Sequence, residues 1–405
     1  MRGLSLIRIA ARARRDRGGV ATIVALLLGG GVLLGCGALA VDVGNIMWER
    51  RQLQNGADAL SLALASDCMK GTCTPASVAT AAMTTLNNAN AADRRNGLDS
   101  ARYVNGVCAH NVPGFPECGA TSALWDCPPV PARSAALPYV EVHTSTVTGS
   151  GGTALPPYLS RSMGFSGETV KACARTAWGL PSGYTAQLPL TFSHCEWKTN
   201  TNNGANYQPG PVGASPGYGG AGQPAWPSVA QRVVLFVAKD VASSCYDFNG
   251  HDAPGGFGYL GNNSFGCAAT VNDGGWVLNE PGNSAPTCIE TYVGKVVNMP
   301  IFNCMASYGT QTETWVRAND PKHCLGGQGS NIYYHIVGWG KFYIAAVKVS
   351  GGSPVSAIPG YQPCNGSQRC VAGWFLKGSL DDAPEVVPPS PTNPGYGTST
   401  ALMAG

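Results

Sequence analysis

The sequence predicts an α+β protein in which an N-terminal transmembrane helix continues into an amphipathic helix, followed by a disulfide-rich, mainly β extracellular body. Three observations predict this arrangement. Val20 to Val41 is an uncharged and largely apolar run, Gly and Pro are frequent (54 and 29 in 405 residues), and 15 cysteines are present. Turn-forming residues at this density favour short strands over long helices.

The run from Val20 to Val41 is long enough to cross a bilayer as one helix. At ~1.5 Å per residue it spans ~33 Å, against a hydrocarbon core of ~30 Å. By the positive-inside rule, the basic tail 1–19 is expected in the cytoplasm and the body outside the cell membrane, extracellular or periplasmic. The basic residues of the tail are Arg2, Arg8, Arg12, Arg14, Arg15 and Arg17. The body is close to neutral and has no basic cluster, so no nucleic-acid partner is expected.

Two other interpretations of the N-terminus fit less well. A cleaved signal peptide needs an apolar core of ~7–15 residues, which is shorter than this one. A lipoprotein would use Leu33 to Cys36 as a lipobox, yet the apolar run continues past Cys36. We therefore expect the span to be retained. Gly31 and Gly35 have the small-xxx-small spacing that lets two helices self-associate in lipid, although Gly is also simply common in membrane helices.

The cysteines predict a disulfide framework. Apart from Cys36, they lie in the body and are even in number, and the CxxC pairs of a zinc site are absent. An oxidising compartment outside the membrane favours disulfides over free thiols. Sequence does not fix the connectivity. The nearest neighbours are the easiest pairs to propose, namely Cys68 with Cys73 and Cys364 with Cys370.

The segment beyond the span reads VDVGNIMWERRQLQNGADALSLALA and resembles the N-terminal segment of TadE/TadG-like Flp pilus-assembly proteins. The resemblance implies other Tad/Flp pilus-assembly proteins as partners, besides the membrane. The family-motif residues that we select are Gly19, Asp42, Gly44, Arg51, Leu53, Gln54 and Asp58. The match also includes Gly18, Ala21, Ala59, Leu62 and Ala63.

Two departures from the family pattern limit what the resemblance implies. Pilin-like members have a Glu at the fifth position after the cleavage Gly; counted from Gly19, that position is Val24 here. We therefore expect a tethered protein and not a processed pilin. The D-x-S-x-S metal motif of larger members with a von Willebrand A-type domain is absent from the sequence, so no metal and no cofactor are expected.

The family-like segment also reads as an amphipathic helix from its own residues. Leu53, Ala57, Leu60 and Leu64 recur on one helical stripe, which suits packing on the body or on a partner helix. Gly56 interrupts this helix at a cost of ~1 kcal/mol relative to Ala.

The body is predicted to form two lobes. Alternating residues predict a half-buried strand over 139–148 and a second over 169–178, with a third over 188–197. Further strands are expected at 232–238, 287–297, 332–337, 340–349 and 370–380, and a helix at 76–90. The expected domains are a tail 1–19, a transmembrane helix 20–41, a TadE/TadG-like helix 42–66, a first lobe 67–198, a Gly/Pro/Asn-rich linker 199–227, a second lobe 228–380 and a disordered tail 381–405.

No catalytic constellation is predicted, and the chain is not expected to be an enzyme. Gly213 to Gly217 matches G-x-S-x-G and Gly217 to Gly222 matches G-x-G-x-x-G, but neither follows a strand and opens a helix. The leading hypothesis is a membrane-anchored structural protein of a Tad/Flp pilus or the cell envelope. The alternatives are a secreted hydrolase using Ser215, and an anchored adhesin or carbohydrate-binding module using Trp276, Trp315, Trp339 and Trp374.

Overall fold

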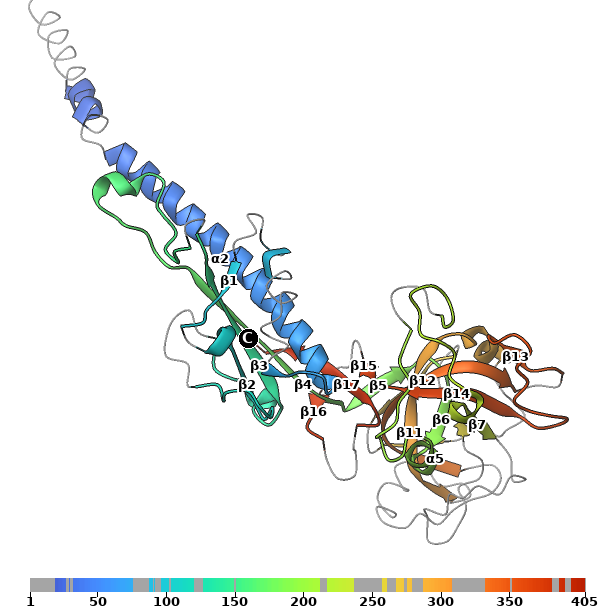
Figure 1. Ribbon diagram of the computed structural model, residues 1–405. Helices are drawn as coiled ribbons and strands as arrows, with labels where there is room; N and C mark the ends of the chain where they lie inside the picture. Colours follow the sequence, from blue (N-terminus) through green and yellow to red (C-terminus); the bar gives the residue numbers. More distant parts are fainter. Residues whose placement is uncertain are drawn as a thin grey trace, which may run out of the picture.

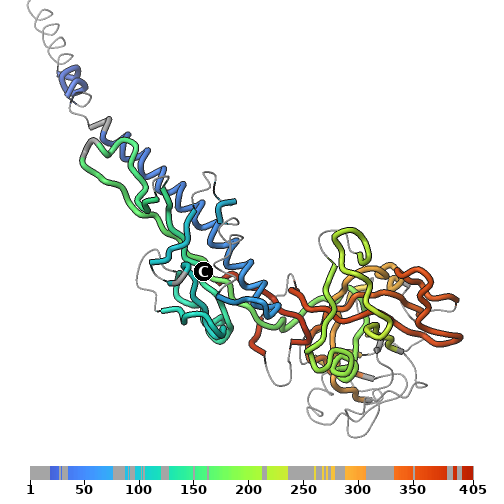
Figure 2. The backbone as a smooth tube through the Cα atoms, viewed as in Figure 1, coloured from blue at the N-terminus to red at the C-terminus, as the bar shows by residue number. Residues whose placement is uncertain are grey.

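The computed structural model describes the chain in segments. They are residues 19–26, 29, 32–75, 87–89, 91, 96–101, 103–119, 127–148, 151–211, 217–236, 257–260, 267–272, 275–278, 287–307, 332–349, 352–380, 386–389 and 395–404. Two β-rich lobes make up the body, and a long helix, α2 (Val32–Met69), runs along the first of them and extends beyond it (Figures 1 and 2).

Helix α2 runs without interruption through the family-like segment 42–66. Residues 19–26 and residue 29 are also helical, whereas residues 27, 28, 30 and 31 of the predicted span lie outside the described residues. Among the residues that the structure describes, no helix has both the length and the apolar character that a membrane crossing requires.

The first lobe is a sheet covered on one face by α2. Its central strands are β3 and β4, which pair antiparallel with Glu141 opposite Arg175 and Thr144 opposite Ala172. The seven strands are β1 (Asn96–Leu98), β2 (Val107–His110), β3 (Tyr139–Thr146), β4 (Lys171–Pro181), β15 (Gly378–Ser379), β16 (Val386–Val387) and β17 (Thr398–Met403). Leu60 and Leu64 of α2 pack on Val140 and Val142 of β3, so the predicted stripe faces the body.

The second lobe is built on an eight-stranded sheet with the long β11–β12 antiparallel pair at its centre. Its strands are β6 (Leu190–Ser193), β7 (Val233–Phe236), β8 (Phe257–Tyr259), β10 (Trp276–Leu278), β11 (Val296–Ser307), β12 (Ile332–Lys348), β13 (Val355–Ser356) and β14 (Cys370–Leu376). A separate pair joins β5 (Gly183–Ala186) to β9 (Ala269–Asn272). Helix α5 (His194–Asn200) follows β6, with Ser193 as its N-cap.

The second lobe is inserted between strands of the first sheet. The chain leaves the first lobe at the end of β4 and returns through β15, which pairs with β17, and β16, where Val386 pairs with Pro181. The last strand, β17, then pairs antiparallel with β4, so the C-terminus lies in the first lobe (Figure 1). The segment 381–405 was expected to be disordered. That expectation is wrong for its described residues, which include the strands β16 and β17. Both strands pair with β4, whose backbone groups on that edge would otherwise lack a partner.

The predicted linker 199–227 does not separate the lobes. The chain passes from the first lobe to the second near position 182, between β4 and β5. The described residues of the predicted linker belong to the second lobe. Tyr218 is buried among Tyr343, Trp374 and Leu376, with Trp226 packed against it. Two aromatic side chains provide this Gly-rich segment with enough apolar surface to join a core.

Several strand predictions need correction. β3 is buried along its whole length and not on one face, because α2 covers one face and cross-linked loops cover the other. Residues 188–197 divide into β6 and α5, and the strand expected at 287–297 begins with a 3-10 helix at Thr287–Tyr292. The strands expected at 332–337 and 340–349 form one strand, β12. Most of the predicted helix 76–90 lies outside the described residues, as does Trp315.

Candidate functional site

The family-motif residues divide into two groups according to what they face. Leu53 is fully buried against Val170 and Ala172 of the first sheet. Gln54 donates to the backbone carbonyl of Cys173 on β4 at 3.0 Å and to Asp58 Oδ1 at 2.9 Å. The Leu53–Gln54–Asp58 part of the motif therefore fixes α2 to the first lobe.

Hydroxyl groups reinforce this helix–sheet contact. Thr144 Oγ1 on β3 donates to the backbone carbonyl of Leu53 at 3.0 Å. Ser61 and Thr176 share a buried hydrogen bond of 2.8 Å between their hydroxyl groups. A buried hydrogen bond contributes ~1 kcal/mol net, and an unpaired partner would cost more. The polar positions of β3 and β4 thus determine the register of the helix as well as its face.

Gly56 lies where α2 passes close to neighbouring side chains. A Cβ at this position would lie 2.2 Å from Asn87 Oδ1 and 2.8 Å from Asn96 Nδ2. Asn96 Nδ2 in turn donates to the backbone carbonyl of Gln52 at 2.9 Å. Close packing therefore requires Gly at position 56, although helix propensity alone would rate this Gly as destabilising.

Asp42 holds the loop between β3 and β4 against the helix. Its carboxylate accepts hydrogen bonds from the backbone amides of Tyr158 (2.7 Å), Leu159 (3.2 Å) and Ser160 (2.8 Å). The side chain is only 7% exposed. The hydroxyl of Ser160 lowers the pKa of Asp42, burial opposes this, and the backbone amides lower it further, so the carboxyl group is held below its ordinary value. The charged form of Asp42 is thus the one that clamps the loop.

The other motif residues face away from the body. Gly19 and Gly44 are exposed, and a side-chain carbon added at either position would meet no atom within 4 Å. Arg51 is exposed on α2, and so is Leu62, which also belongs to the family-like match. Gly44, Arg51 and Leu62 thus lie on a surface of α2 that the described residues leave uncovered, whereas Gly19 lies before α2. Of the two glycines proposed for self-association, Gly35 has an open surface and Gly31 lies outside the described residues.

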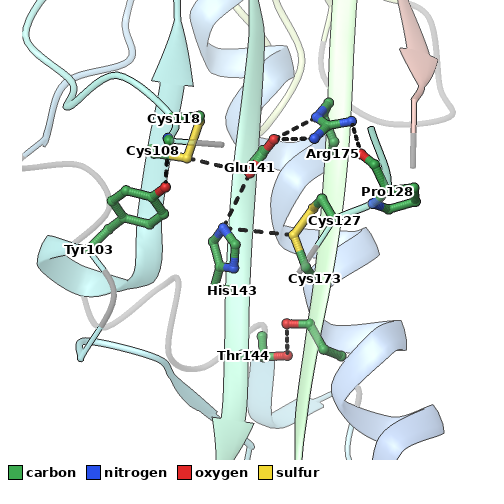
Figure 3. A network of polar contacts seen from close by, with 12 residues as sticks. Tyr103, Cys108, Cys118, Cys127, Pro128, Glu141, His143, Thr144, Cys173 and Arg175 are labelled. Atoms are coloured by element: carbon green, nitrogen blue, oxygen red, sulfur yellow. Dashed lines mark hydrogen bonds and ion pairs between the residues drawn. A yellow bond between two sulfur atoms is a disulfide. The ribbon is translucent and has the colours of Figure 1, made fainter. Parts of the chain in front are cut away.

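A buried ionic network occupies the sheet face opposite α2 (Figure 3). Glu141 and Arg175 are paired across β3 and β4 and are 2% and 1% exposed. Arg175 Nε donates to Glu141 Oε1 at 2.7 Å, and its Nη1 donates to the carbonyl of Pro128 at 2.8 Å. His143 Nε2 lies 3.3 Å from Glu141 Oε2. The sequence patterns did not predict this network, although Glu141 and Arg175 each lie on the opposite parity from the apolar residues of their strand.

The network holds Glu141 in its charged form. Burial raises the pKa of Glu141, but the hydrogen bond to His143 and the charge of Arg175 outweigh it and lower the pKa below its ordinary value. Arg175 also reaches the last strand, since its backbone carbonyl accepts from the amide of Ala404 at 2.9 Å. The network therefore joins β3, β4, the loop at Pro128 and the C-terminal strand.

Disulfides surround this network. The structure pairs Cys108 with Cys118 and Cys127 with Cys173, and their sulfur atoms lie within reach of Glu141 and His143. Sulfur in a disulfide is not a thiolate ligand, so the cluster in this state is a cross-linked core and not a metal centre. The structure also pairs Cys68 with Cys73, Cys364 with Cys370 and Cys267 with Cys288. The thiol of Cys36 is free and exposed on α2.

The alternative sites predicted from the sequence are not assembled in the described residues. Trp276, Trp339 and Trp374 are buried in the second lobe, so they form no exposed platform for a sugar. Ser215 lies outside the described residues, and Gly217 to Gly222 form a turn that opens no helix.

The comparisons with known proteins agree with the sequence resemblance at the N-terminus. No curated protein and no solved structure matches the chain. Residues 19–67 match the family described as putative Flp pilus-assembly TadE/G-like. This match begins at Gly19 and ends within α2, so it includes the Asp42 clamp and the helix–sheet contact. The N-terminal helical segment of this chain is therefore similar to the putative Flp pilus-assembly TadE/G-like family over residues 19–67.

Proposed function

We propose that the chain is a single-pass membrane protein of a Tad-type (Flp) pilus assembly, with its β-rich body held outside the cell membrane. The observation that carries the proposal is the position of the TadE/G-like segment in the fold. Most of residues 19–67 lie in α2, which covers one face of the first sheet and is hydrogen-bonded to β3 and β4 at Leu53, Gln54 and Ser61.

Two properties of the chain support the proposed compartment. The arginine-rich tail and the uncharged run 20–41 predict an N-terminus in the cytoplasm and a helix across the membrane. Described cysteines on both lobes are joined in disulfides, as is usual outside the cytosol. A tethered body of this kind suits a structural component of the assembly better than a filament subunit released by processing.

The uncovered surface of α2 is the proposed contact with partner proteins of the assembly. Gly44, Arg51 and Leu62 belong to the family-like match yet contact little of their own chain. An exposed residue contributes little to the stability of its own fold, so its place in the match is better explained by a contact outside this chain.

Gene deletion with the pilus genes intact tests the proposal. We expect loss of pili, or pili of altered number, in electron micrographs and adhesion assays, with restoration by the wild-type gene. Arg51→Glu combined with Leu62→Asp should fail to restore pili at normal protein levels. Val229→Asp, at an exposed position of the second lobe, is the matched control and should restore them. Unchanged pili and adhesion in the deletion strain would refute the proposed function.

A further inference from the structure

A group of exposed apolar side chains, here called the collar, lies on one side of α2 next to the end of the predicted span. It consists of Tyr158, Leu159 and Phe165 from the β3–β4 loop, together with Leu39 and Val43 of α2. Tyr158 is 71% and Phe165 64% exposed, which is unusual for aromatic side chains on a body whose other large aromatics are mostly buried. Exposed apolar side chains that gather in one place mark an interaction surface.

The Asp42 clamp fixes the height of this collar. The amides of Tyr158, Leu159 and Ser160 are bonded to the carboxylate of the residue that directly follows the apolar run. Phe165 and Leu39 line the same pocket, so the loop extends back along the helix to the last turn of the run. The headgroup layer is ~5–8 Å thick on each side of the hydrocarbon core. At ~1.5 Å per residue, positions within a turn of Asp42 fall inside that layer.

The pocket between the loop and the helix has a volume of about 270 Å³ and is amphipathic. Its apolar lining includes Leu39, Val43, Ile46, Leu155 and Phe165, and its polar lining consists of Asp42, Asn45, Ser160 and Glu168. Sites for whole small molecules have volumes of ~300–1,000 Å³, so this pocket suits part of a longer chain. Arg161, exposed on the same loop, adds a cationic group of the kind that favours phosphate headgroups.

We propose that the collar is a phospholipid-binding surface: Tyr158 and Phe165 lie in the headgroup layer of the outer leaflet, and the pocket receives an acyl chain beside α2. The inference rests on the proposed membrane crossing by residues 20–41. Tyr suits this interface because its ring is apolar and its hydroxyl group is polar, whereas the wholly apolar ring of Phe165 suits the acyl-chain side of the layer. The collar gives the first lobe a second point of attachment, which fixes its tilt relative to the membrane as a single helix does not.

Photocrosslinking of the full-length chain tests the collar. p-Benzoylphenylalanine is placed at position 158, 165 or 62, and the protein is reconstituted in vesicles of phosphatidylethanolamine and phosphatidylglycerol. Position 62 is the matched control, since Leu62 is exposed on α2 but lies ~30 Å beyond Asp42 along the helix. We expect lipid adducts by mass spectrometry at 158 and 165 and none at 62. Asp42→Ala should reduce the adduct at 165, because the loop loses its anchor, while the protein stays in the vesicles.

The outcomes separate this inference from the proposed function. A protein that stays in carbonate-washed vesicles but gives no lipid adduct at 158 and 165 overturns the collar and leaves the membrane crossing intact. Adducts to a second copy at these positions would also overturn it, since the surface would then be a protein interface. Equal lipid labelling at position 62 would show that the label does not report depth and would contradict the inference. Loss of the protein from washed vesicles would instead refute the membrane crossing itself.

Discussion

Gly56→Ala and Gly44→Ala make the same chemical change on the same helix and should have opposite effects. Helix propensity favours Ala over Gly by ~1 kcal/mol at either position. At Gly44 nothing lies within 4 Å of the added carbon, so the propensity gain should appear as increased stability. At Gly56 the added carbon would lie 2.2 Å from Asn87 Oδ1, closer than carbon and oxygen can approach.

The net effect at Gly56 follows from three contributions. Forcing an extra carbon into a packed contact costs ~1–3 kcal/mol. Displacing Asn96, whose amide would lie 2.8 Å from the new carbon, endangers its hydrogen bond to Gln52 at a further cost of ~1 kcal/mol. The propensity gain offsets ~1 kcal/mol of this. We therefore expect Gly56→Ala to lower the free energy of unfolding by roughly 1–3 kcal/mol.

Thermal unfolding of the full chain in detergent, followed by circular dichroism, measures the two variants side by side. Each kcal/mol shifts the Tm of a domain of this size by ~2–4 °C. Asn87→Ala combined with Gly56→Ala should recover part of the loss, because it removes the nearer of the two clashing groups. A Tm raised in both single variants would refute the close approach of Asn87 and Asn96 to α2.

Three further predictions concern the buried network, the acid response and the joint between the lobes. Arg175→Met should lower the free energy of unfolding by about 3–5 kcal/mol, because the buried Glu141 carboxylate loses the guanidinium group that pairs with it. Adding Glu141→Gln should restore part of this free energy. Equal urea midpoints for the wild type and Arg175→Met would contradict the prediction. The pKa values of Glu141 and Asp42 are lowered in the folded state, so the charged carboxylates stabilise the fold fully at pH values above their ordinary pKa, near ~4. This stabilisation is lost as the pH falls through the folded-state pKa values. Glu141→Gln should therefore flatten the acid limb of a pH–stability curve. Tyr396→Ala should cost ~3–5 kcal/mol and speed hydrogen exchange in α5 and β12 more than in α2, because Tyr396 is buried in the core of the second lobe. Unchanged exchange in α5 and β12 would contradict this.

The sequence predicted the local elements of the first lobe because each has its own periodic pattern. The stripe from Leu53 to Leu64 predicted both a helix and the face that α2 buries, and the alternation in 139–148 and 169–178 predicted β3 and β4. The burial of both faces of β3 could not be read from that alternation. The covering loops carry Cys118 and Cys127, which are joined to Cys108 of β2 and Cys173 of β4, and sequence does not specify these partners.

For the candidate site, the sequence indicated which residues of α2 matter but not which distant residues they contact. The resemblance selected Asp42, yet nothing near it in sequence indicates its partners at positions 158–160, which are more than a hundred residues away. Propensity described Gly56 as a weakness, because the clash that makes it necessary comes from Asn87 and Asn96. Glu141 and Arg175 were detectable in principle, as opposite charges on the same parity of two adjacent strands.

The C-terminal segment shows why composition led to the wrong result there. A Pro-rich stretch with few apolar residues cannot form a core by itself, and this favours disorder when it is read alone. Here the stretch needs no core of its own, because its described residues pair with the edge of β4 and add to the core of the second lobe. Tyr396 is fully buried in that core, its hydroxyl lies 3.0 Å from His194 Nδ1, and it adopts a φ of 40°, a region that normally favours glycine. A side chain held in that conformation indicates that packing between the lobes outweighs local backbone preference. The inserted lobe and the returning strand are therefore interdependent: β17 extends the first sheet, and Tyr396, two residues before it, belongs to the second core.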